Sequence, residues 1–574
     1  FKLPSEINFE AFMAGNDVLL FPEDVPSAIE KFKLAYSANL FSDERLAFSV
    51  KKILKFKYKA GLNSYKPIAT ENLYNDLNSS ENDALQYELY ENAITVLKNT
   101  AAVLPIKNLD KQKIAYVKIG DDSNDAFVST LKKYADVTVV ADTNLDSLQV
   151  KLQGFTTVII GYHKSDVAFR NDDLKSNELF KINFLAKNNN VILDVFAKPY
   201  SLLPITNFDD FEGLVVSYQN STISQIVSAE LIFGAIEAKG KLPVSINTSF
   251  KVNDGLATEK LNRLGFTTPE NVGMNAEILS KIDAIANKAI NGKMTPGIQV
   301  LVARKGKVIY QKSFGHHTYD KTIKVQDSDI YDVASLTKIL ATLPNVMLQY
   351  DQQKINLETT LGTMSPIFKD SNKANINFKD LLSHYAGLAA GIPFYKATMD
   401  KSKFPSEVYF RKTSEEQFSK RMTDSLFIRN DFSDTIMKMI VKSKLSLKKE
   451  YKYSDLTFMI LKDYLEKTTG KTLDILIQEN FYRSLGMNNS SFNPLGKFDK
   501  NRIPPTETDT YFRHQLLQGY VNDLSAALEG GVSGHAGVFS NAMDVAKIME
   551  LYLQKGNYGN QQYFSEKTFE DFNT

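Results

Sequence analysis

The sequence contains no cysteine, so neither a disulfide bond nor a thiolate metal site can form in this chain. It also lacks any apolar run approaching the roughly 18 residues that a membrane-spanning helix needs. The formal net charge is only +1, and acidic and basic residues alternate without a basic stripe, which argues against nucleic acid as a partner. No nucleotide-binding glycine motif follows a strand-like run, and Gly120 precedes the acidic pair Asp121-Asp122, which would repel a phosphate. These absences leave a globular protein for which no cofactor is expected.

The length of 574 residues exceeds what one hydrophobic core supports, and roughly 150 residues per domain predicts three or four domains. The first residue is Phe1 rather than methionine, and no signal-peptide pattern follows it. Residues 9–12 lead directly into residues 15–21, as if the chain began inside a structural element. We therefore interpret the sequence as part of a longer protein and expect any signal sequence to lie outside it.

Residues 1–62 have a mainly helical pattern with one strand. The apolar run 18–21, closed by Pro22, predicts a buried strand. A helix is expected from Ser42, which can cap it, to Gly61, which can end it. The polar stretch 63–83 is predicted to be a linker.

Residues 84–250 alternate between strand-like and amphipathic helical stretches, which predicts a parallel α/β sheet with helices on both faces. A second linker is expected at 251–271, where glycines and a proline gather. A helix over 275–290 and a hairpin turning at Lys305-Gly306 follow, with a further strand near 538–539. The predicted strands of the sheet are 114–119, 137–140, 157–160, 191–196 and 214–217.

Ser335 and Lys338 form a Ser-x-x-Lys pair at the point where a strand-like segment gives way to a helix. The spacing alone carries little information, because the same pair recurs at Ser49, Ser129 and Ser446. One helical turn places Ser335 and Lys338 on the same face, and a helix N-terminus offers N–H groups for an oxyanion. A lysine one turn away can activate a serine nucleophile.

Three later motifs follow Ser335 in order: Leu381 to Leu388, Tyr453-Ser454-Asp455 and His535-Ala536-Gly537. Together the four motifs resemble those of the class C β-lactamase and penicillin-binding protein family, over residues 272–574. The resemblance implies an antiparallel sheet with a helical part, and it implies that this domain continues beyond Thr574.

The resemblance also implies roles for individual residues. Ser335 would attack a carbonyl and become acylated, Lys338 and Tyr453 would move the protons, and the backbone N–H groups of Ser335 and Val538 would form the oxyanion hole. The substrate would contact Asp455, His535 and Gly537. Asp455 stands where the family usually has asparagine, and His535 where β-lactamases have lysine. Both departures favour peptidase, amidase or esterase chemistry over efficient β-lactamase activity, although Asp455 could equally be a helix cap.

The N-terminal half resembles glycoside hydrolase family 3, in its β-N-acetylglucosaminidase branch, at residues 14–20, 92–106 and 233–244. This implies a remnant of a TIM barrel at 1–62 and an α/β sandwich domain at 84–250. The glycosidase nucleophile is unknown, because the family's aspartate would lie upstream of residue 1. Asp17 is interpreted as structural, and the 574-residue chain is not expected to hydrolyse chromogenic N-acetylglucosaminides.

The six histidines are not expected to bind metal. His316-His317 resembles a metal-binding pair, but no carboxylate cluster stands near it in the sequence. His384 is interpreted as structural, and His163 and His514 have no supporting partners in the sequence.

The two resemblances together imply an α/β and α+β multidomain protein that acts on a substrate containing both sugar and peptide. Peptidoglycan or a fragment of it fits, so we expect a bifunctional bacterial cell-wall hydrolase in the periplasm or outside the cell. Its glycosidase half would be a β-N-acetylhexosaminidase, and its serine half a D-amino-acid peptidase, amidase or esterase, or a weak β-lactamase. The alternatives are a non-catalytic module that binds wall peptides and a carbohydrate esterase. The oligomeric state stays open.

Overall fold

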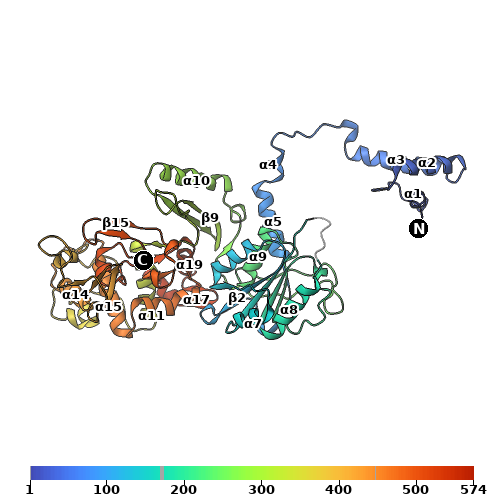
Figure 1. Cartoon of the computed structure of the whole chain (residues 1–574). Coiled ribbons are helices and arrows are strands. Elements are labelled where there is room, and N and C mark those ends of the chain that lie inside the picture. The colour runs from blue at the N-terminus through green and yellow to red at the C-terminus, as the bar shows by residue number, and fades with distance from the viewer. Residues whose placement is uncertain (1, 168–172, 447, 574) are drawn as a thin grey trace. The chain divides into compact units, whose positions relative to one another are not determined.

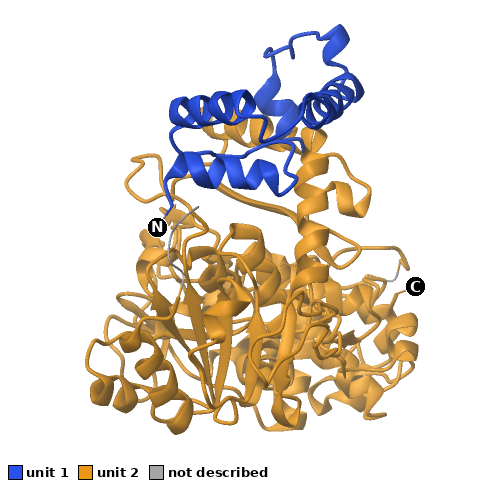
Figure 2. Ribbon diagram, turned by 90° about the vertical axis from the view of Figure 1, so that its right-hand side faces the viewer, with its two compact units in different colours: residues 1–79 blue, residues 80–574 orange. Residues whose placement is uncertain are grey.

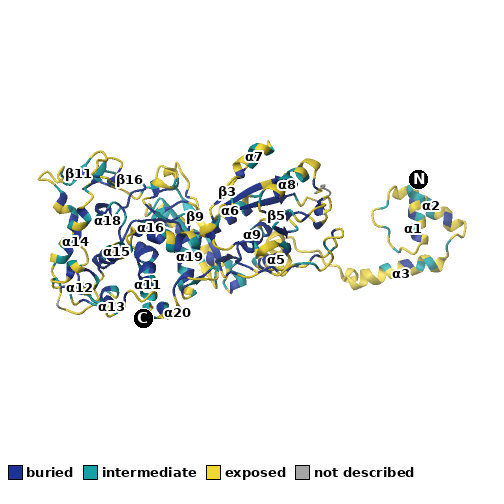
Figure 3. Cartoon of the chain, turned by 90° about the horizontal axis from the view of Figure 1, so that it is seen from below, coloured by how far each residue is buried: buried dark blue, intermediate teal, exposed yellow. Residues whose placement is uncertain are grey.

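The computed structural model describes residues 2–167, 173–446 and 448–573. The chain divides into two compact units, residues 1–79 and residues 80–574 (Figure 2). Buried residues concentrate in the second unit, whereas helix α3 (Asp43–Lys59) is mostly exposed (Figure 3). A search of the described residues finds no helix with the length and apolar character needed to cross a membrane.

The first unit consists of helices in its described residues. Its longer helices are α1 (Pro4–Met13), α2 (Val25–Ser37) and α3, followed by the short helix α4 (Leu73–Leu77). As predicted, Ser42 caps α3, because its side chain accepts a hydrogen bond from the backbone of Arg45. The buried core is small and gathers around Phe12.

The strand predicted at residues 18–21 is wrong. Residues 18–21 form bends and irregular chain, and Leu20 and Phe21 are 92% and 97% exposed. A buried strand needs neighbouring strands to take its backbone hydrogen bonds, and none pairs with this segment in the described part of the unit. Asp17 accepts hydrogen bonds from Ser49 and Lys52 at 2.7 and 2.6 Å, which agrees with its structural interpretation.

The second unit contains the predicted parallel sheet, which includes the strand labelled β2 in Figure 1. Its strand order is β1-β6-β5-β4-β2-β3. All pairs are parallel except β1 with β6 at one edge. Helices α5, α6 and α9 contribute to the core on one face, and α7 and α8 to the core on the other. The bounds are β1 Thr95–Asn99, β2 Ile114–Gly120, β3 Val137–Val139, β4 Thr157–His163, β5 Val191–Phe196, β6 Gly213–Val216, α5 Ser80–Ala93, α6 Asp125–Tyr134, α7 Leu145–Leu152, α8 Ser176–Asn188 and α9 Thr222–Ile232.

The two stretches expected to be linkers are partly structured. Helix α5 begins at Ser80, inside the first of them. In the second, Gly265–Phe266 forms strand β7, which pairs with β9, and Leu261 and Leu264 are fully buried. The glycines and the proline of 251–271 indicated flexibility, but the leucines between them pack into the core.

The C-terminal part of this unit contains the predicted hairpin of β8 (Gly297–Arg304) and β9 (Lys307–Gly315) and the helix α10 (Ala276–Asn291). A second antiparallel sheet joins β10 (Tyr331–Asp332), β17 (Val538–Ser540) and β14 (Ser491–Phe492). The remaining elements are α11 Leu343–Asp351, α12 Leu361–Met364, α13 Phe378–Leu382, β11 Phe410–Arg411, β12 Lys420–Thr423, β13 Leu426–Ile428, α14 Phe432–Lys442, α15 Asp455–Thr469, α16 Leu473–Ile477, α17 Arg483–Leu485, β15 Glu507–Asp509, β16 Gln515–Leu517, α18 Leu524–Leu528, α19 Ala542–Leu553, β18 Asn557–Tyr558, β19 Gln561–Gln562 and α20 Glu566–Phe572.

The sheet and the C-terminal part approach closely at Gly486, just after α17. A Cβ atom at this position would lie 1.9 Å from the backbone oxygen of Tyr134 at the end of α6. The residue also has a φ of +68°, which favours glycine. The two parts therefore share one continuous core in the second unit.

Candidate active site

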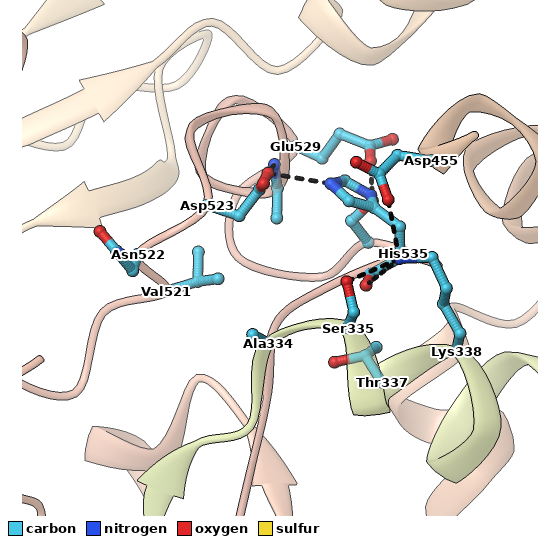
Figure 4. A network of polar contacts seen from close by, with 12 residues as sticks. Ala334, Ser335, Thr337, Lys338, Asp455, Val521, Asn522, Asp523, Glu529 and His535 are labelled. Atoms are coloured by element: carbon cyan, nitrogen blue, oxygen red, sulfur yellow. Dashed lines mark hydrogen bonds and ion pairs between the residues drawn. The ribbon is translucent and has the colours of Figure 1, made fainter. Parts of the chain in front are cut away.

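Ser335 lies in a short 3-10 turn that follows β10, as the predicted transition from strand to helix requires (Figure 4). The preceding residue, Ala334, has a φ of +45°, a left-handed conformation that costs energy for a residue with a side chain. Its N–H donates to Asp332 Oδ1 at 2.8 Å, which holds the turn. The segment after Ser335 is a π-helical turn rather than a regular α-helix, and α11 begins only at Leu343. Contrary to what the sequence indicated, Ser335 therefore does not lie at the N-terminus of a regular α-helix.

Lys338 is buried beneath Ser335, with 4% of its surface exposed. Its Nζ atom donates to Ser335 Oγ at 2.9 Å and to the backbone oxygen of His535 at 3.1 Å, and it lies 2.7 Å from Asp455 Oδ1. The nitrogen also lies 5.0 Å from the ring centre of Tyr453. A buried ammonium group is tolerated when its N–H bonds are satisfied in this way.

The hydroxyl of Tyr453 donates a hydrogen bond to Ser335 Oγ at 3.1 Å. The side chain is 41% exposed, so the phenol faces both the nucleophile and solvent. The ring of His384 lies 4.8 Å from the ring of Tyr453, and its Nδ1 accepts a hydrogen bond from the Ser454 N–H. Burial, with the nearby charge of Lys338, lowers the pKa of His384. His384 thus supports the segment of Tyr453, in line with its structural interpretation.

Asp455 is the first residue of α15, and Ser454 holds the N-cap position without a capping hydrogen bond from its side chain. The alternative in which Asp455 caps this helix is therefore not what the structure shows. Its carboxylate pairs with Lys338 instead, so the acidic replacement of the family's usual asparagine supplies a counter-ion inside the site.

His535 is buried, and both of its ring nitrogens are paired within the protein (Figure 4). Nε2 lies 2.9 Å from Asp523 Oδ1, and Nδ1 lies 2.8 Å from Ser533 Oγ. A substrate could reach the His535 ring only by displacing one of these partners, so the contact with substrate stays a prediction. What His535 brings to the site is its backbone oxygen, which accepts from Lys338.

Gly537 serves the backbone and is not placed by the structure as a substrate contact. It has a φ of +125°, and a Cβ atom would lie 2.3 Å from the backbone oxygen of Gly531. Only glycine fits this close approach, which turns the chain into β17.

With this geometry in place, a family model described as Beta-lactamase matches residues 284–570, half of the chain. The chain belongs to the beta-lactamase family. Among curated relatives, a protein of Escherichia coli (strain K12) called "Putative D-alanyl-D-alanine carboxypeptidase" is 28% identical over 350 residues, covering 56% of this chain and 75% of the relative. A protein of the same name from Salmonella gallinarum is 29% identical over 336 residues, covering 54% of this chain and 72% of the relative.

Solved structures show more distant similarity. A penicillin-binding protein homologue from Pyrococcus abyssi has 18% identity and a TM-score of 0.38, covering 51% of this chain and 59% of that one. A fungal multi-domain GH3 β-N-acetylglucosaminidase has 19% identity and a TM-score of 0.33, covering 44% of this chain and 29% of that one. Similarity at this level does not establish a shared activity.

The Val538 N–H, expected in the oxyanion hole of this beta-lactamase-family site, is already paired. It is buried and donates to Thr337 Oγ1 at 3.1 Å. An oxyanion could use this N–H only by displacing the Thr337 hydroxyl. The oxyanion role of the Val538 N–H stays a prediction.

The residues that pair with His535 and extend its contacts away from Ser335 were not predicted from the sequence. Asp523 pairs with His535, and burial would raise its pKa, but the hydrogen bond and charge of His535 lower it to about 2. Ser533 also donates to Glu529, and Glu529 accepts from Lys462 at 3.2 Å. No motif contains these residues. The only sequence signal was Asp523 as a helix cap, since it does cap α18.

The remaining histidines lie apart from these contacts. His317 Nε2 is 2.7 Å from Asp329 Oδ2, so this half of the pair 316–317 has a carboxylate partner that the sequence did not indicate. The sequence indicates no partner for His163, but its ring nitrogens lie 2.9 Å from Tyr116 Oη and 2.8 Å from Asn220 Oδ1. Burial lowers the pKa of His163 to about 4, which favours a neutral ring.

Proposed function

We propose that this beta-lactamase-family protein is an acyl-serine hydrolase in which Ser335 is the nucleophile. The observation that carries the proposal is the convergence of Lys338 Nζ and Tyr453 Oη on Ser335 Oγ, at 2.9 and 3.1 Å. Two donors at these distances stabilise negative charge as it develops on the attacking oxygen.

In the proposed reaction, the pair of Lys338 and Tyr453 reacts in the form that has lost one proton, as a neutral amine or a phenolate. Ser335 Oγ bonds to the carbonyl carbon of the substrate while its proton passes to that pair. The carbon–leaving-group bond then breaks, and the same proton passes to the leaving group. Tyr453 is the donor at this step, because it is half-exposed and Lys338 is buried. Water later releases the acyl group by the reverse proton path, which regenerates Ser335.

The experiment is covalent labelling by a fluorophosphonate or a fluorescent penicillin. Ser335→Ala is expected to abolish labelling. Ser446→Ala is the matched control, because Ser446 belongs to another Ser-x-x-Lys pair and is exposed. Unchanged labelling of Ser335→Ala would show that Ser335 is not the nucleophile.

For the substrate, we propose a D-amino-acid peptide, amide or ester of the bacterial cell wall, with the protein in the periplasm or outside the cell. The names of the curated relatives support a D-alanyl peptide, and the alignments cover about three quarters of their length. Hydrolysis of a D-Ala-D-Ala peptide, compared with p-nitrophenyl acetate, separates the peptidase from an esterase. Faster turnover of the acetate than of the peptide would contradict the peptidase assignment.

We also propose that residues 84–250 belong to a β-N-acetylhexosaminidase-type protein, so that the whole would act on both sugar and peptide. The support is the parallel sheet together with the family 3 motifs at 92–106 and 233–244. The 574-residue chain is not expected to hydrolyse chromogenic N-acetylglucosaminides. Suppose that this chain hydrolyses these substrates and that Ser335→Ala hydrolyses them equally well. A complete glycosidase site would then lie within the chain.

A second candidate is a non-catalytic module that binds wall peptides. The contact of Asp455 with Lys338 at 2.7 Å favours this candidate. A carboxylate at this distance pairs with Lys338 and so competes with the activation of Ser335 by the same side chain. A protein that retains wall fragments but forms no acyl-enzyme would support this candidate over the hydrolase.

A further inference from the structure

Arg263 is a buried cation far along the chain from the Ser335 site, in the segment that leads into β7. Only 5% of its surface is exposed. Its Nη1 donates to the backbone oxygens of Ile106 and Phe233, at 2.8 and 2.9 Å. Both acceptors are neutral, so these bonds fix the position of the guanidinium group without balancing its charge.

The rest of the guanidinium group is unpaired. Nε is buried with no acceptor, and Nη2 has none in the part of the chain that the structure describes. Arg263 also forms no ion pair with any described carboxylate. Burial lowers the pKa of Arg263. An unpaired buried charge is costly, and buried charges in proteins are normally paired or hold a ligand.

A cavity of about 370 Å³ lies against Arg263. Its wall is formed by the loop 107–111 from the sheet side and by Ser484 and the turn 558–561 from the C-terminal side. Lys111 is exposed at the cavity and has no ion-pair partner among the residues described. The Tyr558 hydroxyl accepts from the Leu264 N–H, which leaves its own proton available for a ligand.

Two carboxylates also line the cavity, but neither balances Arg263. Glu259 is engaged by Lys107 at 2.5 Å and by Asn560 at 2.7 Å. Asp110 is exposed and forms no ion pair with the guanidinium group. The inner end of the cavity is therefore positive, while its carboxylates are occupied or face solvent.

We propose that this cavity binds an oxyanion group, a carboxylate or a phosphate, on the free edge of the Arg263 guanidinium. The planar fork of arginine matches the two oxygens of such a group. The bound group would contact both walls of the cavity and so connect the parallel sheet to the beta-lactamase-family part. The ligand is either a free inorganic anion or an acidic group on a larger molecule.

The test is calorimetric titration of the 574-residue protein with inorganic phosphate and, separately, with acetate, at constant ionic strength. We expect one saturable site per chain. Phosphate binding alone identifies a phosphate ligand, acetate binding alone a carboxylate ligand, and both support the shared chemistry. No saturable binding of either anion up to about 10 mM, a typical weak-ligand limit, overturns the proposal.

Three variants localise the site. Arg263→Gln is expected to abolish binding while keeping a side chain that can donate to the Ile106 and Phe233 carbonyls. Lys111→Glu reverses a charge at the cavity and is expected to weaken binding roughly tenfold. Lys113→Glu is the matched control, because Lys113 is exposed two residues away and does not line the cavity, and it is expected to change binding less than about twofold.

The variants also keep the test decisive if Arg263→Gln fails to fold. In that case the site is tested by comparing anion binding by Lys111→Glu with anion binding by Lys113→Glu. Equal weakening by both, or normal binding by a folded Arg263→Gln, contradicts the assignment. None of these readouts depends on catalysis by Ser335.

Discussion

The two sides of Ser335 differ in a way that the motifs did not reveal. On one side, Tyr453 and Asp455 are partly exposed and contact the Ser335–Lys338 pair directly. On the other side, His535 is buried and paired to Asp523 and Ser533, and only its backbone oxygen contacts Lys338. Family motifs suggest that both sides face substrate, whereas in the structure one side contacts Ser335 and Lys338 through side chains and the other contacts Lys338 through a backbone oxygen. The two sides should therefore respond differently to substitution.

Substitution of Lys338, which both sides of the site contact, should have the largest effect on the rate of acylation. Lys338→Met deletes the donor to Ser335 Oγ and leaves the Asp455 carboxylate without its partner. We expect the rate of acylation to fall by about a thousandfold, within the range for loss of a group that transfers protons. The second-order rate of fluorophosphonate labelling measures this. A fall of less than tenfold would mean that Lys338 holds the structure and does not activate Ser335.

The side with Tyr453 and Asp455 is tested by Tyr453→Phe. The substitution removes the hydroxyl that donates to Ser335 Oγ and keeps the ring against His384. We expect an approximately hundredfold loss in kcat with little change in the melting temperature, because the hydroxyl is partly solvated. Kinetics and thermal unfolding of the same preparation check both halves. A large drop in melting temperature with normal kcat would show that Tyr453 supports the structure only.

The side with His535 is tested by Asp523→Asn. The substitution replaces the carboxylate that His535 Nε2 contacts with a neutral amide, so the loop that carries the His535 backbone oxygen should loosen. We expect kcat to fall roughly tenfold at an unchanged KM, together with a lower melting temperature. A rise in KM with normal kcat would instead restore His535 to a substrate-binding role.

Acid should reduce the difference in the free energy of unfolding between wild type and Asp523→Asn. The pKa of Asp523 is held at about 2, below its ordinary value, so its ionised form stabilises the folded state above that ordinary value. This contribution is lost as the pH falls toward about 2. Urea unfolding across the acid range should therefore show a stability difference that shrinks as the pH falls. We expect this to be the smallest of the four effects predicted here. A stability difference that stays constant down to pH 2 would show that the pair does not stabilise the fold through charge.

The sequence predicted the regular elements where local patterns and tertiary packing agree. The hairpin at Lys305-Gly306 and the strands of the parallel sheet are examples, because turn residues and apolar runs specify them directly. The segment 18–21 failed, because an apolar run shows strand propensity but not whether a neighbouring strand exists to pair with it.

For the site, order along the chain located Ser335, Lys338 and Tyr453, which the structure brings within hydrogen-bonding distance. The sequence could not show the direction in which a side chain points. His535 turns inward because Asp523, twelve residues before it, meets its ring, and such a pairing has no local signature. The oxyanion role of the Val538 N–H was likewise predicted from the motif. Its hydrogen bond to Thr337 forms because β17 packs against the turn that carries Ser335, and the sequence does not show this packing.

The central claim is that Ser335 forms a covalent acyl-enzyme, and intact-protein mass spectrometry tests it most directly. Wild-type protein incubated with a penicillin or an activated D-alanyl ester should gain the mass of one acyl group, which maps to the peptide containing Ser335. Ser335→Ala should gain none, and Ser446→Ala should behave as wild type. An unmodified wild-type protein that still binds wall peptides would contradict the account.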